Sequence, residues 1–125
     1  MTTAEEWRDI PGYEGLYEVS STGEVRSVER MVNAPRGKRR VRSKILAPST
    51  HHRGYKLVNL HREGKRKSTA VHLLVAKAFL GSQPHEGMVV AHVDGDPTNT
   101  RLDNLIWVTR EVVQFLSEAR LKKAA

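Results

Sequence analysis

A histidine between two apolar runs is the residue of this chain best placed to do chemistry. Residues 89–91 are apolar and lead into His92, a turn rich in Asp, Gly, Pro and Asn follows over 94–99, and a second apolar run begins at Leu105. This order predicts a strand, a structured loop and a second strand, with the imidazole held at the rim of the first strand. Because the pKa of an imidazole lies near neutral pH, a histidine in this position can take up or release a proton.

The charge of the chain points to a polyanionic partner. Its 125 residues include 21 Lys and Arg against 14 Asp and Glu, which gives a formal net charge of +7. Nucleic acid is therefore the first partner class, and a merely soluble basic protein is the alternative. The chain has no cysteine, which excludes a disulfide framework and a Cys-ligated zinc site. The acidic N-terminus and the lack of a long apolar segment predict a cytoplasmic protein with no membrane partner.

Turn signals divide the N-terminal part of the chain. Pro11-Gly12 and Thr22-Gly23 flank an imperfectly alternating segment at 16–20, and a second short segment follows at 25–28. This spacing predicts a β-hairpin over these two segments. Aromatic side chains are the expected anchors of its small core: Trp7, Tyr13 and Tyr17.

The middle of the chain is strongly basic. Six cations fall within the nine positions 36–44, namely Arg36, Lys38, Arg39, Arg40, Arg42 and Lys44. Such a run cannot face a core, so we predict a solvated loop that contacts phosphates. Two further strands are predicted at 55–60 and 67–71, on either side of a turn at 62–65. Their polar faces carry further basic side chains, among them Lys56, Arg66 and Lys67. A basic antiparallel sheet of this kind fits a DNA groove.

Two helices are predicted in the C-terminal half. Residues 71–80 are apolar at helical spacing and are followed by Gly81, which predicts a short buried helix. His72 lies beside its apolar stripe and is interpreted as a hydrogen-bonded core residue. Thr109 is the predicted N-cap of a final helix. Its apolar stripe is expected at Val112, Phe115, Leu116 and Ala119, with Arg120, Lys122 and Lys123 in its last turns.

Three motifs follow one another along the chain. The first is Gly12-Tyr13-Glu14-Gly15 with Tyr17-x-Val19-Ser20, the second is the helix over 71–79, and the third is the strand, loop, strand and helix around His92. In this order they resemble HNH homing endonucleases of phages and introns, which carry an N-terminal NUMOD-type module. The resemblance implies an α+β fold with N-terminal antiparallel β-hairpins followed by a ββα-metal (HNH) core. It also implies a basic, β-rich DNA-binding module at 1–70 and a nuclease core at 71–125.

The resemblance assigns catalytic roles to two residues. His92 takes the place of the general base that deprotonates the water attacking the scissile phosphate. Asn104 takes the place of the central Asn of the family, whose amide pins the loop between the strands and so holds the histidine. Asp94, Gly95 and Asn99 are expected to build that loop through Asx-type hydrogen bonds rather than to bind metal. The implied function is hydrolysis of phosphodiester bonds in duplex DNA with a divalent metal, Mg²⁺ or Mn²⁺, by a phage- or mobile-element-encoded protein in its host cell.

The chain departs from the family at two ligand positions. The family commonly places an Asp before the histidine and an Asn or His in the final helix, where this chain has Ala91 and Val113. Hydrocarbon side chains cannot bind a hard cation, so the metal ligands stay unassigned. A shift of one residue would bring Glu111 or Gln114 to the second position. Ala91 is either natural or an introduced inactivating change.

Two functions from different classes therefore remain. The first is a metal-dependent DNA endonuclease, with full or weakened activity. The second is a catalytically degenerate HNH-fold factor that binds DNA or a protein partner. A plain basic RNA-binding domain is disfavoured, because the chain lacks an RNA-recognition aromatic motif.

Overall fold

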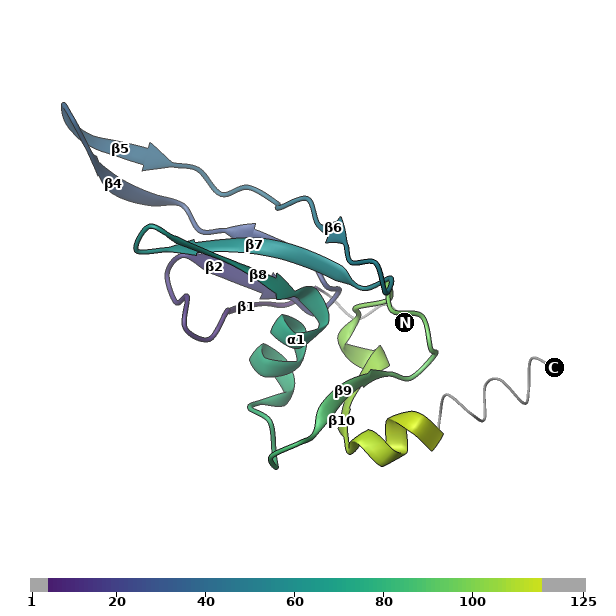
Figure 1. Cartoon of the computed structure of the whole chain (residues 1–125). Coiled ribbons are helices and arrows are strands. Elements are labelled where there is room, and N and C mark those ends of the chain that lie inside the picture. Colours follow the sequence, from purple (N-terminus) through teal and green to yellow (C-terminus); the bar gives the residue numbers. More distant parts are fainter. Residues whose placement is uncertain (1–4, 116–125) are drawn as a thin grey trace.

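Antiparallel strands dominate the first part of the chain (Figure 1). The structure is a computed structural model that describes residues 5–115. Its first sheet has the order β1-β2-β3 and consists of β1 (Trp7–Asp9), β2 (Tyr17–Ser20) and β3 (Val25–Ser27). The Ser20 hydroxyl accepts the backbone N–H groups of Thr22 at 3.3 Å and Glu24 at 3.0 Å, which closes the turn between β2 and β3. The predicted hairpin is confirmed, whereas β1 is too short and exposed to show in the sequence pattern.

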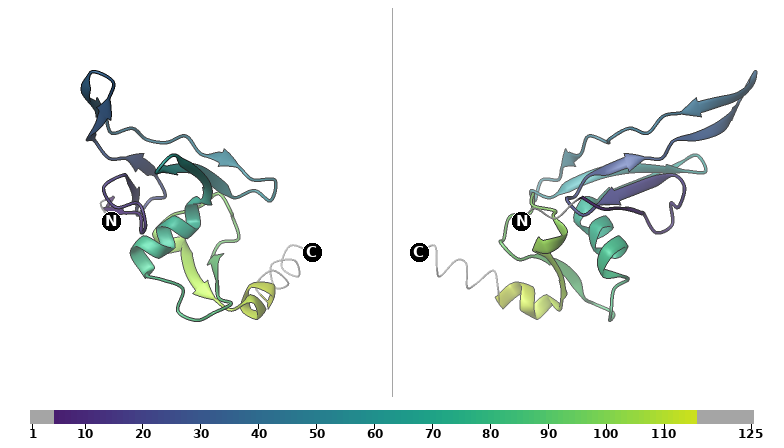
Figure 2. Two further views of the ribbon diagram at one scale, coloured as in Figure 1. Left: turned by 60° about the vertical axis from the view of Figure 1, so that its left-hand side comes forward. Right: turned by 180° about the vertical axis from the view of Figure 1, so that it is seen from behind.

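The basic run is part of a β-hairpin that projects from the body of the molecule (Figures 1 and 2). Strand β4 (Arg30–Ala34) pairs with β5 (Gly37–Val41) around a turn at residues 35 and 36. The prediction of a loop over 36–44 is therefore wrong for 37–41. A two-stranded ribbon is solvated on both faces, so its residues can form a strand without showing the alternation that marks a half-buried strand.

A second sheet has the order β6-β7-β8 and contains β6 (Ser49–Thr50), β7 (Lys56–Arg62) and β8 (Lys65–Ala70). Strands β7 and β8 confirm the predicted pair. The two residues between them, Glu63 (φ 52°) and Gly64 (φ 76°), both adopt the left-handed conformation. Such a two-residue turn matches the right-handed twist of the paired strands.

The C-terminal half begins with helix α1 (Val71–Val75), which continues as a π-helical turn, η1 (Ala76–Leu80). This confirms the predicted helix and its end at Gly81. Strand β9 (Val89–His92) pairs antiparallel with β10 (Leu105–Val108), and the 3₁₀ turn η2 (Leu102–Asn104) comes just before β10. Residues 110–115 are helical. The remaining expectations for the final helix lie outside the described residues: Leu116, Ala119, Arg120, Lys122 and Lys123.

One hydrophobic cluster joins the N-terminal sheets to the C-terminal half. Its buried members come from both sides of residue 70, namely Ile10, Tyr17, Val19, Val25, Val58, Leu60, Val71, Leu74, Val75 and Leu105. Tyr17 is thus a core anchor as predicted, and Tyr13 packs against the cluster. Trp7 is only half-buried, with the Arg26 guanidinium carbon 3.9 Å from its ring centroid. The proposed boundary at residue 70 falls between β8 and α1, and the core crosses it.

The β2–β3 turn also fixes the loop that follows β9. Leu102 N–H donates to the Ser21 carbonyl at 2.8 Å. A Cβ atom at Gly23 would lie 2.0 Å from Thr100 Oγ1, so only glycine permits this approach. Among the described residues, no helix has the length and apolar character needed to cross a membrane.

Candidate functional site

His92 is the last residue of β9 and lies opposite Leu105 on β10. Side chains alternate along a strand, so His92 shares one face of the hairpin with Leu105, a member of the hydrophobic cluster, and Ala91, which is 7% exposed, points to the other face with Ile106. His92 is half-buried. The chain turns directly after it, because Gly95 N–H donates to the His92 carbonyl at 2.9 Å. The predicted strand with an imidazole at its rim is confirmed.

The loop between the two strands is tied together by Asn104, which is 7% exposed. Its Oδ1 accepts Asp94 N–H at 3.0 Å, and its Nδ2 donates to Asp94 Oδ1 and to the Asn99 carbonyl, each at 3.0 Å. Its own carbonyl accepts Val93 N–H at 2.8 Å. One side chain therefore connects both ends of the loop, as the family resemblance implies.

The two aspartates of the loop are used as hydrogen-bond acceptors. Asp94 Oδ2 accepts the Asn99 amide at 2.8 Å, and Asp94 Oδ1 also accepts Asp96 N–H at 2.8 Å. The hydrogen bond from Asn99 is the main cause that lowers the pKa of Asp94, followed by the bonds from Asp96 and Asn104, with a smaller part from the His92 charge. Hydrogen bonds from Thr98, and then the charge of His92, likewise lower the pKa of Asp96. These carboxylates therefore stay ionised near neutral pH, close to the imidazole.

His72 lies against His92, which sequence reasoning did not foresee. The two ring centroids are 4.8 Å apart and the ring planes meet at 65°, an edge-to-face contact. Burial, and then the charge of His92, lowers the pKa of His72 to about 4. Its interpretation as a hydrogen-bonded core residue is wrong, because its buried Nδ1 has no hydrogen-bond partner in the described part of the chain. Helical spacing places His72 beside the apolar stripe, but no local signal tells which distant strand it meets.

Comparison with known proteins identifies both halves of the chain. Residues 5–61 match the NUMOD4 motif, and residues 69–114 match the HNH endonuclease family. Residues 69–114 thus form an HNH endonuclease segment. The chain is 40% identical over 107 residues to DNA endonuclease I-HmuI of Bacillus phage SP01, covering 86% of this chain and 54% of that protein. It is also 32% identical over 101 residues to the uncharacterized HNH endonuclease L245 of Acanthamoeba polyphaga mimivirus, covering 81% of this chain and 26% of that protein.

A solved structure shares the fold of this HNH protein. The structure, described as DNA binding and cleavage by the HNH homing endonuclease I-HmuI, matches with a TM-score of 0.74 and 40% identity, over 92% of this chain and 59% of that one. The α+β fold with antiparallel hairpins before the HNH core is thereby confirmed. The chain spans about half the length of I-HmuI and about a quarter of the mimivirus relative.

HNH nucleases typically use a divalent metal ion, but the residues around this site do not fit one. Ala91 and Val113 offer only hydrocarbon, and both oxygens of Asp94 already accept hydrogen bonds. Glu111 is exposed and lines a surface cavity with His85 and Glu86. Within residues 5–115, no three His, Cys, Asp or Glu side chains gather as a metal-binding group. The ligand set that the family resemblance implies is therefore not reproduced.

The predicted DNA-binding cations are spread over two hairpins of this HNH protein. On the β4–β5 ribbon, Arg36 lies in the turn, Lys38, Arg39 and Arg40 are exposed on β5, and Arg42 and Lys44 follow it. Arg66 and Lys67 are exposed on β8. Strand register sorts the β5 cations, because Arg40 pairs with Met31 and Lys38 with Asn33, while Arg39 pairs with Val32 on the opposite face. Arg40 is also ion-paired with Glu29.

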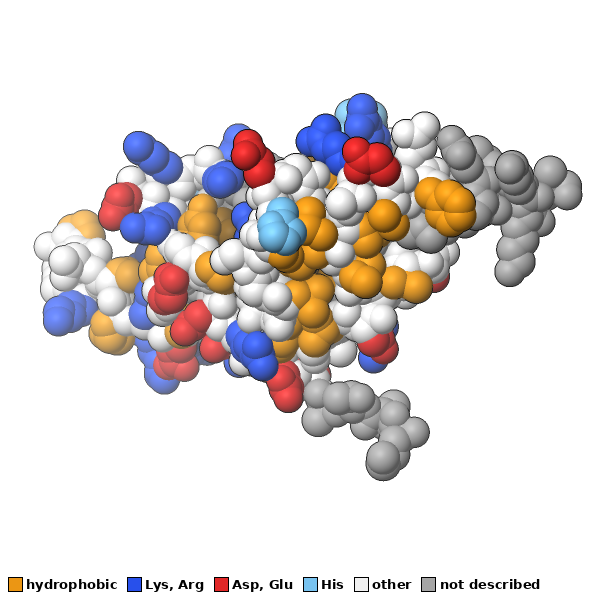
Figure 3. Space-filling model, turned by 90° about the horizontal axis from the view of Figure 1, so that it is seen from below, with side chains coloured by type: hydrophobic (Ala, Val, Ile, Leu, Met, Phe, Trp, Pro, Cys, Tyr) orange, Lys and Arg blue, Asp and Glu red, His pale blue; other side chains and the backbone are white. Residues whose placement is uncertain are grey.

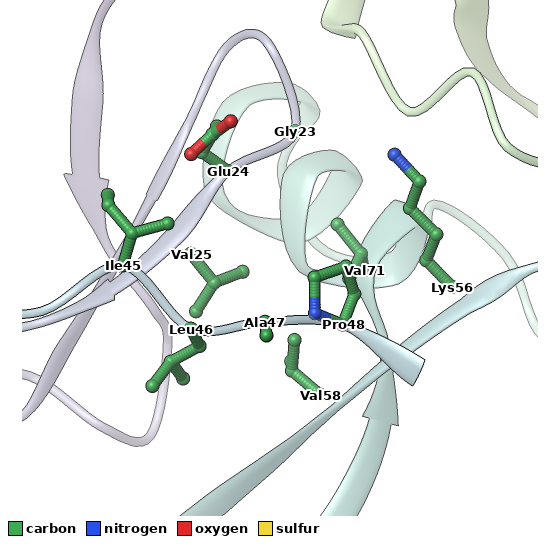
Figure 4. A pocket seen from close by; sticks show the side chains of 10 residues that line it. All are labelled: Gly23, Glu24, Val25, Ile45, Leu46, Ala47, Pro48, Lys56, Val58 and Val71. Atoms are coloured by element: carbon green, nitrogen blue, oxygen red, sulfur yellow. The ribbon is translucent and has the colours of Figure 1, made fainter. Parts of the chain in front are cut away.

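Lys56 has a different environment from the other cations. It is half-buried on β7 and lines a groove of about 270 Å³ together with Val25, Val58 and Val71. Figure 4 shows Lys56 and Glu24 on opposite sides of this groove. The stem of Lys56 thus covers apolar surface, so its contribution to DNA binding is expected to be smaller than that of the exposed cations.

Large hydrophobic side chains of the C-terminal half are also exposed. Leu80, Ile106 and Val112 are 43%, 48% and 41% exposed. In the view from below, hydrophobic side chains gather in the middle of the face, with side chains of both charges around them (Figure 3). Phosphate contact requires positive charge, so the ribbon and β8 are the better DNA surface.

Proposed function

We propose that this chain binds duplex DNA and hydrolyses phosphodiester bonds with His92 as the general base. The observation that carries the proposal is the position of His92, at the end of β9 and next to the loop that Asn104 ties together, within the segment that matches the HNH endonuclease family. The solved relative, described as binding and cleaving DNA, supports it. These comparisons favour an endonuclease over a degenerate binding factor.

The chain's own residues account for the proton transfer. The imidazole of His92 takes a proton from water while the water oxygen bonds to phosphorus, and the bond from phosphorus to the leaving oxygen of the DNA strand breaks. Asn104 does not touch the reacting atoms in this scheme; it keeps the loop, and so the base, in place. We assign no step to a metal ion, since the ligand set does not fit one.

DNA binding is assigned to the β4–β5 ribbon and to β8. A two-stranded ribbon fits the major groove of B-DNA, and the exposed cations of the ribbon lie on both of its faces. Arg39 is exposed, whereas the charge of Arg40 is compensated by Glu29. The relative from a Bacillus phage supports the same proposal for a phage- or mobile-element-encoded protein that acts in its host cell.

Nicking of a supercoiled plasmid, beside a gel-shift assay, tests the catalytic part. The full chain should nick in Mg²⁺ or Mn²⁺, more readily in Mn²⁺, which accepts nitrogen ligands. His92→Ala should shift the same DNA without nicking it. Ala91→Asp with Val113→Asn should raise Mg²⁺-dependent nicking by restoring oxygen ligands. DNA binding without cleavage, even after both ligands are restored, would instead establish the binding-only function.

A matched pair of ribbon variants tests the DNA surface. The plot of log K against log salt has a negative slope. Arg39→Ala should make this slope shallower by about one, as expected for one lost phosphate contact. Arg40→Ala should change the slope less, because its charge is already paired with Glu29. Equal slopes for wild type and Arg39→Ala would exclude the ribbon from the interface.

A further inference from the structure

In the described part of the chain, ring contacts follow one another in a row that ends at His92, and four of these rings, from His51 onward, lead to it. The His51 ring stacks on Tyr55 with centroids 4.2 Å apart and planes at 12°. Tyr55 meets the His72 ring edge-to-face at 5.6 Å, and His72 meets His92 edge-to-face at 4.8 Å. We call these four side chains the ring row. It connects the turn before β7 to the first turn of α1 and to the end of β9.

The base of the ring row is a tight turn. His51 N–H donates to the Tyr55 carbonyl, and Gly54 N–H donates to the His51 carbonyl, both at 2.8 Å. The same turn touches the loop after His92, because a Cβ atom at Gly54 would lie 3.1 Å from Pro97 Cγ. The turn and α1 therefore support the imidazole and its loop from separate elements, which restricts how the imidazole can rotate.

Charged groups of both signs surround the two histidines. The charge of His92 contributes to lowering the pKa values of Asp94 and Asp96, after their hydrogen bonds. It also adds to burial in lowering the pKa of His72, because two imidazolium rings at 4.8 Å would repel each other. Lys77 lines the same cavity of about 330 Å³ as His72 and adds positive charge on that side. Near neutral pH His72 is therefore uncharged.

We propose that His72 is a positioning residue for His92: its ring packs edge-to-face against the imidazole and fixes the plane of that ring. The inference rests on the proposed function of His92 as the general base. It adds to that function a residue twenty positions away, on another element. A neutral, buried neighbour holds the base in one orientation without competing for the proton that it takes from water.

Imidazole titration by NMR in the full chain tests the contact without relying on cleavage. In His92→Gln, the titration midpoint of His72 should rise above its value of about 4, because the His92 charge that lowers it is gone. It should stay below 6.5, because burial, the larger cause, remains. His85→Ala, which removes an exposed histidine outside the ring row, should leave the His72 midpoint unchanged. An unchanged midpoint in His92→Gln would overturn the pairing, and His72→Phe offers the reciprocal measurement on His92.

Nicking kinetics test the positioning itself. His72→Ala should lower kcat on the order of tenfold and leave KM for DNA unchanged, as expected when a base is misoriented but DNA contacts persist. His72→Phe keeps a flat ring of similar size, so it should recover most of kcat at neutral pH and alter the acidic limb of the pH profile. Wild-type kcat and pH profile in His72→Ala would overturn the proposal. If the wild-type chain does not nick DNA, the proposed function fails, while the NMR titration still decides whether the two imidazoles are in contact.

Discussion

The side chain of Asn104 should be the single polar group that contributes most to the stability of the loop after His92. Replacing it by alanine removes three hydrogen bonds, each of 3.0 Å: one from Asp94 N–H, one to the Asp94 carboxylate and one to the Asn99 carbonyl. Asn104 is 7% exposed, so water cannot easily replace the side chain at its own position. The loop should therefore lose order at both of its ends together.

The magnitude follows from the kinds of bond that are lost. The two bonds to backbone groups contribute about 0.5–1.5 kcal/mol each, and the bond to the carboxylate about 1.5–3 kcal/mol. Asp94 is exposed and regains hydrogen bonds from water, which reduces the sum. We expect Asn104→Ala to lower the free energy of unfolding by about 2–4 kcal/mol. For a domain of this size, that corresponds to a decrease in Tm of roughly 8–15 °C.

Chemical and thermal unfolding measure this change, with circular dichroism or the fluorescence of Trp7 and Trp107 as the signal. Asn33→Ala is the matched control, since it removes the same side chain from an exposed position on β4 and should change stability by less than about 0.5 kcal/mol. A Tm for Asn104→Ala equal to that of the control would refute the assigned role of the amide.

Three further predictions concern the same region. Gly23→Ala should lower stability by about 2–4 kcal/mol, because the residue has φ 94° and its Cβ would lie 2.0 Å from the Thr100 hydroxyl oxygen; wild-type melting would contradict this. Burial lowers the pKa of His72 from 6.5 to about 4, so the unfolded chain binds the extra proton between these values and stability should fall as pH decreases from 6.5 to 4. Urea unfolding over this range should show a smaller decrease in His72→Phe, and parallel curves would count against the low pKa. Hydrogen bonds, first from Asn99, lower the pKa of Asp94, so wild type should lose stability as pH falls below about 4, and Asp94→Asn should lose less on the same assay.

The sequence by itself determined the local elements around the site. The apolar run before His92, the Asp- and Asn-rich turn and the second apolar run give the strand, loop and strand of the structure, because turn chemistry and strand alternation act over a few residues. The role of Asn104 in the loop followed from the family resemblance. Its hydrogen-bond partners lie close by in sequence, so the role does not depend on how distant elements pack. The β7–β8 hairpin was likewise predicted, from the alternation at 55–60 and the turn at 62–65.

Tertiary structure alone decided which of these elements meet. The pairing of β5 with β4 could not be seen in a run of cations, because a ribbon that is solvated on both faces shows no apolar periodicity. The contact between His72 and His92 depends on how α1 packs against the strands, and the approach of Gly23 to Thr100 on how the first sheet meets the loop after β9. Such contacts join residues that are distant along the chain, and the local sequence pattern carries no information about them. They depend on how the elements pack in the shared core, which contains Val19, Leu60 and Leu105.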